Sequence, residues 1–385
     1  MLTRRKAVTL ALAASTPSLS LVTSTRAATA DRKLEGLLSA VRYDEELNAT
    51  IPEQASLRIV AQSGKAVVSG SDYTWHAAPD GGGVFEQADG GWIYVSNSEL
   101  SRGRGGVGAV RFDSQANIID AYSILTGTSE NCAGGKTLWG TWLSCEENED
   151  DGQVYECDPT GTEAAIVRPG LGSFNHEAAA IDPQTGYVYL TEDKERGCLY
   201  RFVPKQAGDL SSGSLEVAVA EGMRLAWVPV PDPSASSVST RKQVDNAARF
   251  QGGEGIIYAD DHVYFTTKED NKVWILNVRT MMFRTIYDGS LYDNPILGEV
   301  DNVVMSPGGE LMIAEDNGDM QIVLLGEGYR PIPVVTLHGQ DESEVCGPDF
   351  SPDGTRLYFS SQRGVSGKLS GGLTYELTLP DNVTG

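Results

Sequence analysis

The chain has 385 residues, enough for one large all-β domain or two average domains, and its 53 acidic and 30 basic residues give a net charge of −23. Such a surface repels nucleic acids and anionic membranes, so we expect no nucleic-acid partner and no membrane insertion. The same charge attracts cations, although an acidic surface is also common on proteins that are merely soluble.

The first 30 residues have the pattern of an export signal. Arg4 and Arg5 precede a weakly apolar run, and Ala28 to Ala30 offer a cleavage site of the A-x-A type. Paired arginines indicate twin-arginine export, and the ordinary secretory route remains the alternative. We therefore expect residues 1–30 to be removed and residues 31–385 to form a single domain that is secreted or periplasmic.

The sequence contains five cysteines, and none of them belongs to a C-x-x-C motif. A zinc site built on cysteines is therefore not expected. In an oxidising compartment four of the five could pair, which would leave one as a free thiol or a metal ligand. The five are Cys132, Cys145, Cys157, Cys198 and Cys346.

A β-hairpin pattern returns six times along the chain. Each copy has an apolar strand, a polar knot and a second strand, and five copies follow a further strand candidate that ends in a turn such as D-P-x-x-G. Repetition at this period predicts an all-β fold, a six-bladed β-propeller, since a β-sandwich would not explain six returns of one unit. Residues 31 to about 73 are less regular and could cover the side or supply the closing strand. The hairpins span residues 91–113, 137–159, 186–204, 261–278, 309–325 and 355–377.

Acidic residues recur at the start of the innermost strands and in the knots after the second strands. Antiparallel neighbours start and end at the same edge of a sheet, so these acids should meet at one face of the propeller. Several carboxylates in one place require cations, because two unit charges 4 Å apart repel by about 4 kcal/mol at an effective dielectric constant near 20. Oxygen ligands suit Ca²⁺, and a thiolate among them favours iron over zinc. The candidate metal ligands are Cys145, Glu146, Glu177, Glu192, Asp193, Glu254, Glu299, Asp301 and Glu344.

Each of these residues also has a plainer interpretation. An isolated Glu-Asp pair in a turn is more often solvated than bound to a metal. Cys145 alone would more often be a small buried residue or half of a disulfide.

Several segments resemble the PhoX-type alkaline phosphatases. These are "GTWLSCEEN", "FNHEAAAIDPQTGYVYLTED", "EVDNVVMSPGGELMIAED" and "GPDFSPDGTRLYFSSQ", and the resemblance runs from about Leu138 to Gln362. It implies a six-bladed propeller, twin-arginine export, a cluster of Fe³⁺ and Ca²⁺ ions, and hydrolysis of phosphate monoesters.

The resemblance also implies roles for single residues. Cys145 would bind iron, and Arg249, in "ARFQGGEGI", would bind phosphate. The main carboxylate ligands would be Glu146, Glu177, Glu254, Glu299 and Glu344, with Asp301, Glu192 and Asp193 as further ligands. This chain is shorter than is usual in the family, above all after "CEEN".

A phosphate monoester dianion needs local positive charge to bind a protein of net charge −23. Metal ions would supply it together with Arg249, Lys268 and Arg363, although Lys268 and Arg363 could equally be solvated surface charges. We expect a metal-dependent phosphatase that is a monomer and acts on a small phosphoester. Two alternatives stay open, a Ca²⁺-dependent lactonase or esterase that does not need Cys145, and a non-catalytic, metal-stabilised binding propeller.

Overall fold

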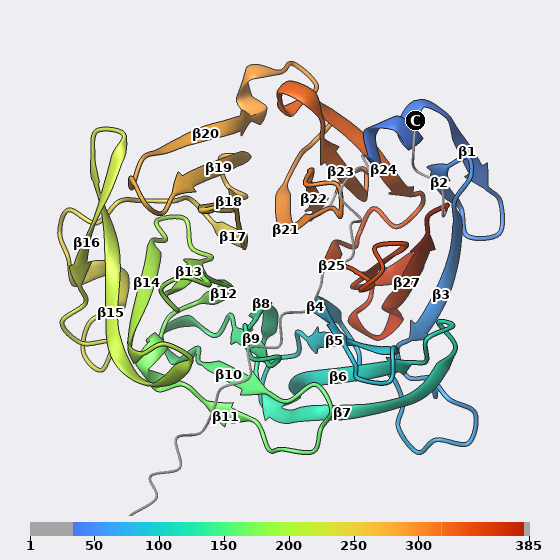
Figure 1. Cartoon of the computed structure of the whole chain (residues 1–385), viewed down its shortest axis with the longest axis horizontal. Coiled ribbons are helices and arrows are strands. Elements are labelled where there is room, and N and C mark those ends of the chain that lie inside the picture. The colour runs from blue at the N-terminus through green and yellow to red at the C-terminus, as the bar shows by residue number, and fades with distance from the viewer. Residues whose placement is uncertain (1–33, 317, 381–385) are drawn as a thin grey trace, which may run out of the picture.

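The computed structural model describes residues 34–316 and 318–380. The expected export signal, residues 1–30, lies outside the described residues. Six antiparallel sheets are arranged around a central axis, so the predicted six-bladed β-propeller is confirmed (Figure 1). The six predicted hairpins are the second and third strands of the six blades.

Each blade has its innermost strand at the axis and its later strands toward the rim. Blade 1 contains β4 (Pro79–Glu86), β5 (Trp92–Ser98), β6 (Gly105–Phe112) and β7 (Ile118–Thr128), and blade 2 contains β8 (Asn131–Lys136), β9 (Trp142–Glu146), β10 (Val154–Cys157) and β11 (Ile166–Val167). Blade 3 contains β12 (His176–Ile181), β13 (Val188–Glu192), β14 (Leu199–Gln206), β15 (Asp209–Glu221) and β16 (Arg224–Pro229), and blade 4 contains β17 (Gly253–Ala259), β18 (His262–Thr267), β19 (Lys272–Asn277) and β20 (Phe283–Asp288).

Blades 5 and 6 take strands from both ends of the described chain. Blade 5 contains β21 (Val300–Met305), β22 (Leu311–Glu315), β23 (Gln321–Leu325) and β24 (Pro331–Leu337), extended by β2 (Ala49–Pro52) and β1 (Val41–Asp44). Blade 6 contains β25 (Val345–Phe350), β26 (Arg356–Ser361), β27 (Leu373–Thr378) and β3 (Ser56–Gln62). The irregular N-terminal region thus covers one blade and closes another.

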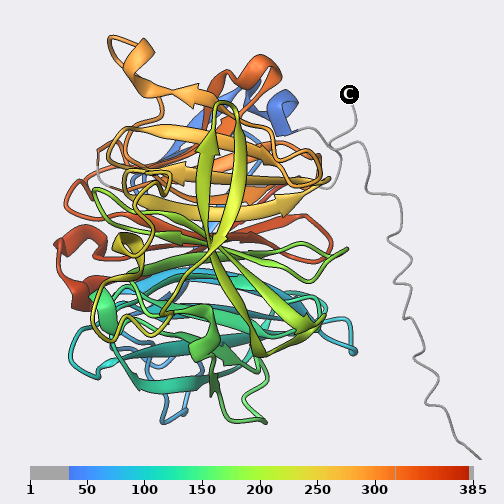
Figure 2. The same cartoon turned by 90° about the vertical axis from the view of Figure 1, so that its left-hand side faces the viewer.

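Short 3₁₀ helices and one long hairpin complete the fold. The helices are η1 (Leu34–Ser39), η2 (Glu149–Asp151), η3 (Pro169–Leu171), η4 (Thr240–Lys242), η5 (Gly289–Leu291), η6 (Glu327–Tyr329), η7 (Gly364–Ser366) and η8 (Leu369–Gly371). Figure 2 shows the β15–β16 hairpin along the rim of blade 3, away from the axis. No helix in the described part of the chain is long and apolar enough to cross a membrane.

The pairing of β3 with β27 closes the ring. Leu57 lies opposite Leu377, and Ile59 lies opposite Tyr375, in an antiparallel register. In the chain β3 comes before blade 1, and in space it is the outermost strand of blade 6. The pairing therefore ties the first blade to the last and closes the propeller. Apolar clusters fill the space between neighbouring blades.

The innermost strands pack so closely that they require small residues. A Cβ atom at Gly255 would lie 2.6 Å from the backbone nitrogen of Val303 in the next blade. A Cβ atom at Gly347 would lie 2.7 Å from the carbonyl oxygen of Asp80, and the backbone there has φ +65°. Glycine is therefore required at both positions.

A largely apolar cavity of about 360 Å³ follows the axis between the inner strands of all six blades.

All six innermost strands also share an irregularity near their first residues. The register with the second strand shifts in each of them, between His176 and Ala179 in β12 and between Val300 and Val303 in β21, for example. A β-bulge changes the direction in which a side chain points. The residues at these bulges are the ones that form the site described next.

Candidate metal centre at the axis

Two positions of the repeated blade deliver side chains to one end of the axis. The first is the bulge residue of the innermost strand, which comes directly after the first residue paired with the second strand. The second is the residue that follows the second strand, at the same edge of the blade. The first set is Asp80, Cys132, Glu177, Glu254 and Asp301 in blades 1 to 5, and the second set is Glu99, Glu147, Asp193, Lys268, Asp316 and Gln362. In blade 6 the equivalent Cys346 is paired with Ser360, and its sulfur contacts the carbonyl oxygen of Pro79 (3.1 Å).

Glu344 adds one more carboxylate to these two sets. It precedes β25, and an isolated β-bridge joins it to Asp316 of blade 5. Among the described residues, the axis therefore gathers nine carboxyl groups from these positions, against the two cations Lys268 and Arg363.

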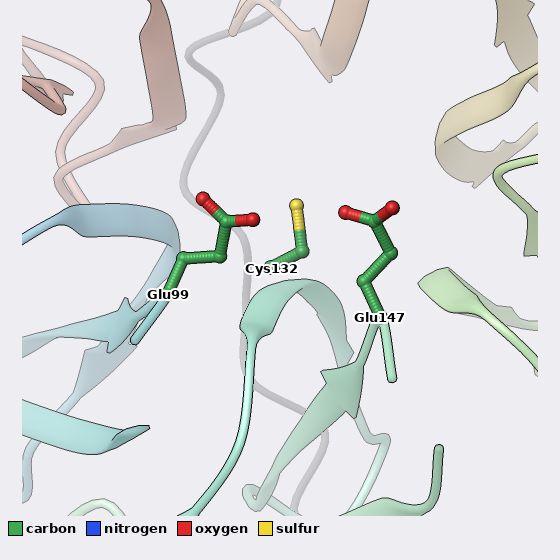
Figure 3. Close-up of side chains that lie close together, drawn as sticks. All are labelled: Glu99, Cys132 and Glu147. Carbon is green, nitrogen blue, oxygen red and sulfur yellow. The ribbon is translucent and has the colours of Figure 1, made fainter. Parts of the chain in front are cut away.

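Three groups of these side chains are close enough to share a metal ion. In each group one potential ligand atom per residue lies within 4.8 Å of the others. Figure 3 shows one group, in which the thiol of Cys132 on β8 lies between the carboxyl groups of Glu99 and Glu147. The other two groups contain carboxylates alone, and they are Asp80 with Glu99 and Glu344, and Glu177 with Glu254 and Asp301.

Hydrogen bonds between blades fix the backbone at three of the bulges. Asn97 Nδ2 donates to the carbonyl oxygen of Cys132 (3.0 Å). In the same way Thr191 Oγ1 donates to Glu254 (2.5 Å), and Thr266 Oγ1 donates to Asp301 (2.6 Å). Each donor belongs to the second strand of the preceding blade. These bonds hold three potential ligands without using their side chains.

Glu177 shows why the described side chains do not complete this site. It is fully buried, and neither of its carboxylate oxygens has a hydrogen-bond partner among the described residues. Burial, followed by the charges of Glu254 and Asp301, raises the pKa of Glu177 far above its usual value. A buried carboxylate without partners is strongly unfavourable, and a metal ion relieves this penalty.

The pKa values of two neighbouring acids are raised for the same reasons. Burial raises the pKa of Asp301 to about 7, although the charge of Lys268 opposes the shift. Burial and the charges of Asp193 and Glu99 raise the pKa of Glu147 to about 8. Carboxylates with a thiol are a donor set that fits metal ions, with hard ions on the oxygens and a transition ion near the sulfur.

The two cations are also held by carboxylates. Lys268 Nζ lies 3.0 Å from Glu254 Oε1, 3.2 Å from Asp316 Oδ2 and 3.6 Å from Asp193 Oδ2. Arg363 Nη2 lies 3.2 Å from Glu344 Oε1, and its side chain is 29% exposed. Arg363 is therefore accessible from solvent next to one of the carboxylate groups.

The structure brings together seven of the residues that the sequence singled out. They come from blades 3 to 6, where the innermost strands or the knots were recognised from the sequence. Their metal-binding or substrate-binding roles stay predictions. The seven are Glu177, Asp193, Glu254, Lys268, Asp301, Glu344 and Arg363.

Cys145 does not join this group. It lies on β9 opposite Val154 and is fully buried in the apolar core that also contains Leu143 and Phe174. Burial alone raises the pKa of its thiol, with no contribution from the acidic cluster. All five cysteines are free, so the four that could have paired form no disulfides. The thiol at the axis is that of Cys132.

Glu146 and Glu192 end their strands and bind the polypeptide instead. Glu146 accepts backbone hydrogen bonds from Ser129 (2.8 Å) and Gln153 (3.1 Å). Glu192 accepts from the backbone of Cys198 (3.0 Å), from Tyr200 Oη (2.9 Å) and from Arg241 Nη1 (3.0 Å). The residue after each of them, Glu147 or Asp193, is the one at the axis.

Glu299 and Arg249 also lie outside the three groups. Glu299 is exposed, and its backbone carbonyl accepts from the amide of Asp316 (2.9 Å). Arg249 Nη1 donates to the carbonyl oxygens of Arg196 (3.2 Å) and Arg241 (2.8 Å) and contacts Cys198 Sγ (3.0 Å). Its guanidinium therefore stabilises the loop before β17.

The sequence analysis missed Asp80, Glu99, Cys132, Glu147 and Asp316 as residues of the site. Asp80 and Cys132 lie in the glycine-rich segments "PDGGG" and "NCAGGK", which lack the β-branched residues typical of strands. The signal that could have found them is the repeat itself. Every hairpin requires an innermost strand before it, and "NCAGGK" is the segment in that place before the second hairpin.

A family model confirms the resemblance that the sequence segments showed. The model described as "Alkaline phosphatase PhoX" matches residues 41–282. The chain belongs to the PhoX alkaline phosphatase family. No curated protein matches the sequence.

Solved structures of other proteins have the same fold. PhoX from Pseudomonas fluorescens, solved in complex with vanadate, a transition state analogue, is 16% identical with a TM-score of 0.70, and the match covers 86% of this chain and 96% of that one. A gluconolactonase from Xanthomonas campestris is 13% identical with a TM-score of 0.51, covering 85% of this chain and 90% of that one. At these identities the likeness establishes the propeller fold, and the membership in the PhoX family comes from the sequence match.

Proposed function

We propose that this PhoX-family chain is a metal-dependent phosphatase that hydrolyses phosphate monoesters at a cluster of Fe³⁺ and Ca²⁺ ions on the propeller axis. The observation that carries the proposal is the buried group of Glu177, Glu254 and Asp301, in which both oxygens of Glu177 lack partners. Membership in the family supports the reaction type. We further propose that the protein acts outside the cytoplasm as a monomer.

The ligand atoms of each group indicate which of the proposed ions it would bind. Fe³⁺ would lie at Cys132 with Glu99 and Glu147, since a thiolate favours a transition ion. Ca²⁺ would lie at the all-carboxylate groups, since hard ions prefer oxygen ligands. Glu177, Glu254, Asp301 and Glu344 keep the role that the sequence predicted, and Cys132 replaces Cys145 as the thiol ligand.

The bound ions would offset the charge that develops on the phosphoryl oxygens and would make water more acidic. Arg363 is the side chain best placed to bind the substrate phosphate, because it is solvent-accessible and beside Glu344. Its planar group of donors suits phosphate oxygens. Arg249 takes no part in this proposal, because one of its terminal nitrogens is already engaged by two backbone carbonyls and a sulfur atom.

Metal analysis combined with a hydrolysis assay tests the proposal. Protein purified without added metal is expected to contain iron and calcium and to hydrolyse p-nitrophenyl phosphate, and removal of the metals is expected to abolish hydrolysis. A metal-free protein that remains active would overturn the proposal, as would a metal-loaded protein that hydrolyses no phosphate monoester.

The lactonase alternative can be tested on the same preparations. Its support is the fold likeness to a gluconolactonase, which does not extend to the sequence family. Hydrolysis of gluconolactone with Ca²⁺ present, together with no release of phosphate, would favour it. Binding of metal with neither reaction would favour a non-catalytic binding propeller.

A further inference from the structure

One side of the axis already contains a cation that belongs to the chain. The ammonium group of Lys268 lies within 3.6 Å of carboxylate oxygens from three consecutive blades, those of Asp193 in blade 3, Glu254 in blade 4 and Asp316 in blade 5. A hydrogen bond from its backbone amide to the carbonyl of Gly252 (2.8 Å) fixes where the side chain begins.

The position of Lys268 in the repeat makes this arrangement informative. Glu99, Glu147, Asp193 and Asp316 occupy the same place in four other blades, directly after the second strand. Among the described residues at this position, Lys268 is the one cation, and the sixth blade has the neutral Gln362. Gln362 Nε2 donates to both Asp80 and Glu99 (2.6 Å each), so it also satisfies acids at the axis.

The surroundings of Lys268 have the composition of a site for a hard divalent cation. Three carboxylates from separate strands converge on one point, and Glu254 also belongs to the group with Glu177 and Asp301. Without positive charge, these acids would repel each other by several kcal/mol per close pair. A tethered ammonium group supplies one positive charge and three hydrogen-bond donors at that point.

We propose that the ammonium group of Lys268 takes the place of one divalent cation at the axis, so that this chain binds one ion fewer than its carboxylates could hold. The inference rests on the proposed metal centre, because it assigns the cations of that same site. Asp193, Glu254 and Asp316 are then neutralised in part by the protein itself. The exchangeable ions would bind at the three groups that contain Glu177, Cys132 and Asp80. Because the lysine cannot dissociate, chelators would leave this side of the axis compensated.

Calcium stoichiometry of a charge-removing variant tests the inference. Wild type, Lys268→Met and Lys272→Met are stripped with chelator, dialysed and titrated with Ca²⁺ by calorimetry, with elemental analysis of the loaded proteins. Lys272 lies in the same blade and pairs with the partly exposed Asp270 (2.9 Å), so Lys272→Met removes one charge away from the axis. Lys268→Met is expected to bind one additional Ca²⁺ per chain, while Lys272→Met binds as many as wild type.

The thermal stability of the stripped proteins provides a second measurement. Metal-free Lys268→Met is expected to melt well below metal-free wild type, and Ca²⁺ is expected to raise its melting temperature by a larger amount. Lys268→Gln, which keeps hydrogen-bond donors, serves if the methionine variant does not fold, and Lys268→Arg is expected to keep the wild-type stoichiometry.

The outcomes separate this inference from the proposed function. If wild type binds metal and neither neutral variant binds more, the lysine does not replace an ion, and the metal centre still stands. If wild type binds none but Lys268→Met binds one Ca²⁺, the replacement holds and the proposed metallophosphatase fails. Absence of binding in all variants would overturn both.

Discussion

The hydroxyl group of Thr266 in blade 4 donates a 2.6 Å hydrogen bond to the backbone carbonyl of Asp301 in blade 5. Both residues are buried, and Asp301 belongs to the group with Glu177 and Glu254. This bond therefore links the position of a potential metal ligand to the packing between two blades.

Replacement of Thr266 by valine removes this donor and keeps the shape of the side chain. A buried carbonyl that loses its partner costs about 1–3 kcal/mol, so Thr266→Val is expected to lower the free energy of unfolding by that amount and to weaken metal binding. Urea unfolding and Ca²⁺ titration measure the two effects. Thr126→Val, on an exposed site of β7, is the control and should change neither. Equal behaviour of the two variants would contradict the positioning role of Thr266.

Variants of Cys132 and Cys145 are expected to differ in their iron content. Cys132→Ser removes the thiol between Glu99 and Glu147 and is expected to lose most of the iron. Cys145→Ser places a hydroxyl in an apolar core, so it is expected to retain iron while its free energy of unfolding falls by about 1–3 kcal/mol. Elemental analysis and denaturant unfolding of both variants provide the comparison. Iron lost from the Cys145 variant and kept in the Cys132 variant would restore the ligand that the sequence predicted.

Arg363 and Arg249 can be distinguished by steady-state kinetics. Arg363→Met is expected to raise KM for p-nitrophenyl phosphate by about 10-fold or more and to weaken inhibition by inorganic phosphate, because a charged phosphate contact is lost. Arg249→Met removes the donor to two backbone carbonyls and is expected mainly to lower stability. A larger rise in KM for the Arg249 variant than for the Arg363 variant would refute this assignment.

The ion pair between Arg279 and Asp182 predicts a pH-dependent contribution to stability. The guanidinium donates to both oxygens of the buried Asp182 at 2.6 and 2.8 Å, joining blades 3 and 4. Burial by itself raises the pKa of Asp182, but the hydrogen bonds from Arg279 and from the backbone of Gln184 outweigh it and lower the pKa below 3.8. The lowered pKa in the folded state means that the stabilisation is complete above the unfolded pKa and is lost as pH falls through the folded value.

Arg279→Met is therefore expected to destabilise the protein by about 2–3 kcal/mol at pH 7, since Asp182 loses its cation and keeps only its hydrogen bonds from Gln184 and Thr185. The difference from wild type should shrink as the pH is lowered below about 4. Urea unfolding of both proteins across this range measures it, with the exposed Arg284→Met as the control. A difference that does not depend on pH would show that Arg279 acts through packing alone.

Local features of the sequence were sufficient to predict the fold. Turn motifs such as "DPQTG" and "SPDG" and the return of six hairpins depend on neighbouring residues, so they can be recognised without the tertiary structure. The same features placed Glu177, Glu254 and Asp301 at the starts of innermost strands, where the structure has them. The expectation of a closed ring of acids followed from antiparallel pairing.

Only the tertiary structure decided which residue of "CEE" reaches the axis. Cys145 and Glu146 are the last two residues of β9, where the thiol lies in an apolar core and the carboxylate accepts backbone hydrogen bonds, while Glu147 follows the strand and lies at the axis. The residue at which a strand ends depends on its pairing with the neighbouring strand, and the three letters do not reveal it. The glycine-rich strand with Cys132 forms because close packing at the axis excludes larger residues, which overrides its low β-propensity. The ammonium group of Lys268 likewise meets its three carboxylates only because separate blades converge there.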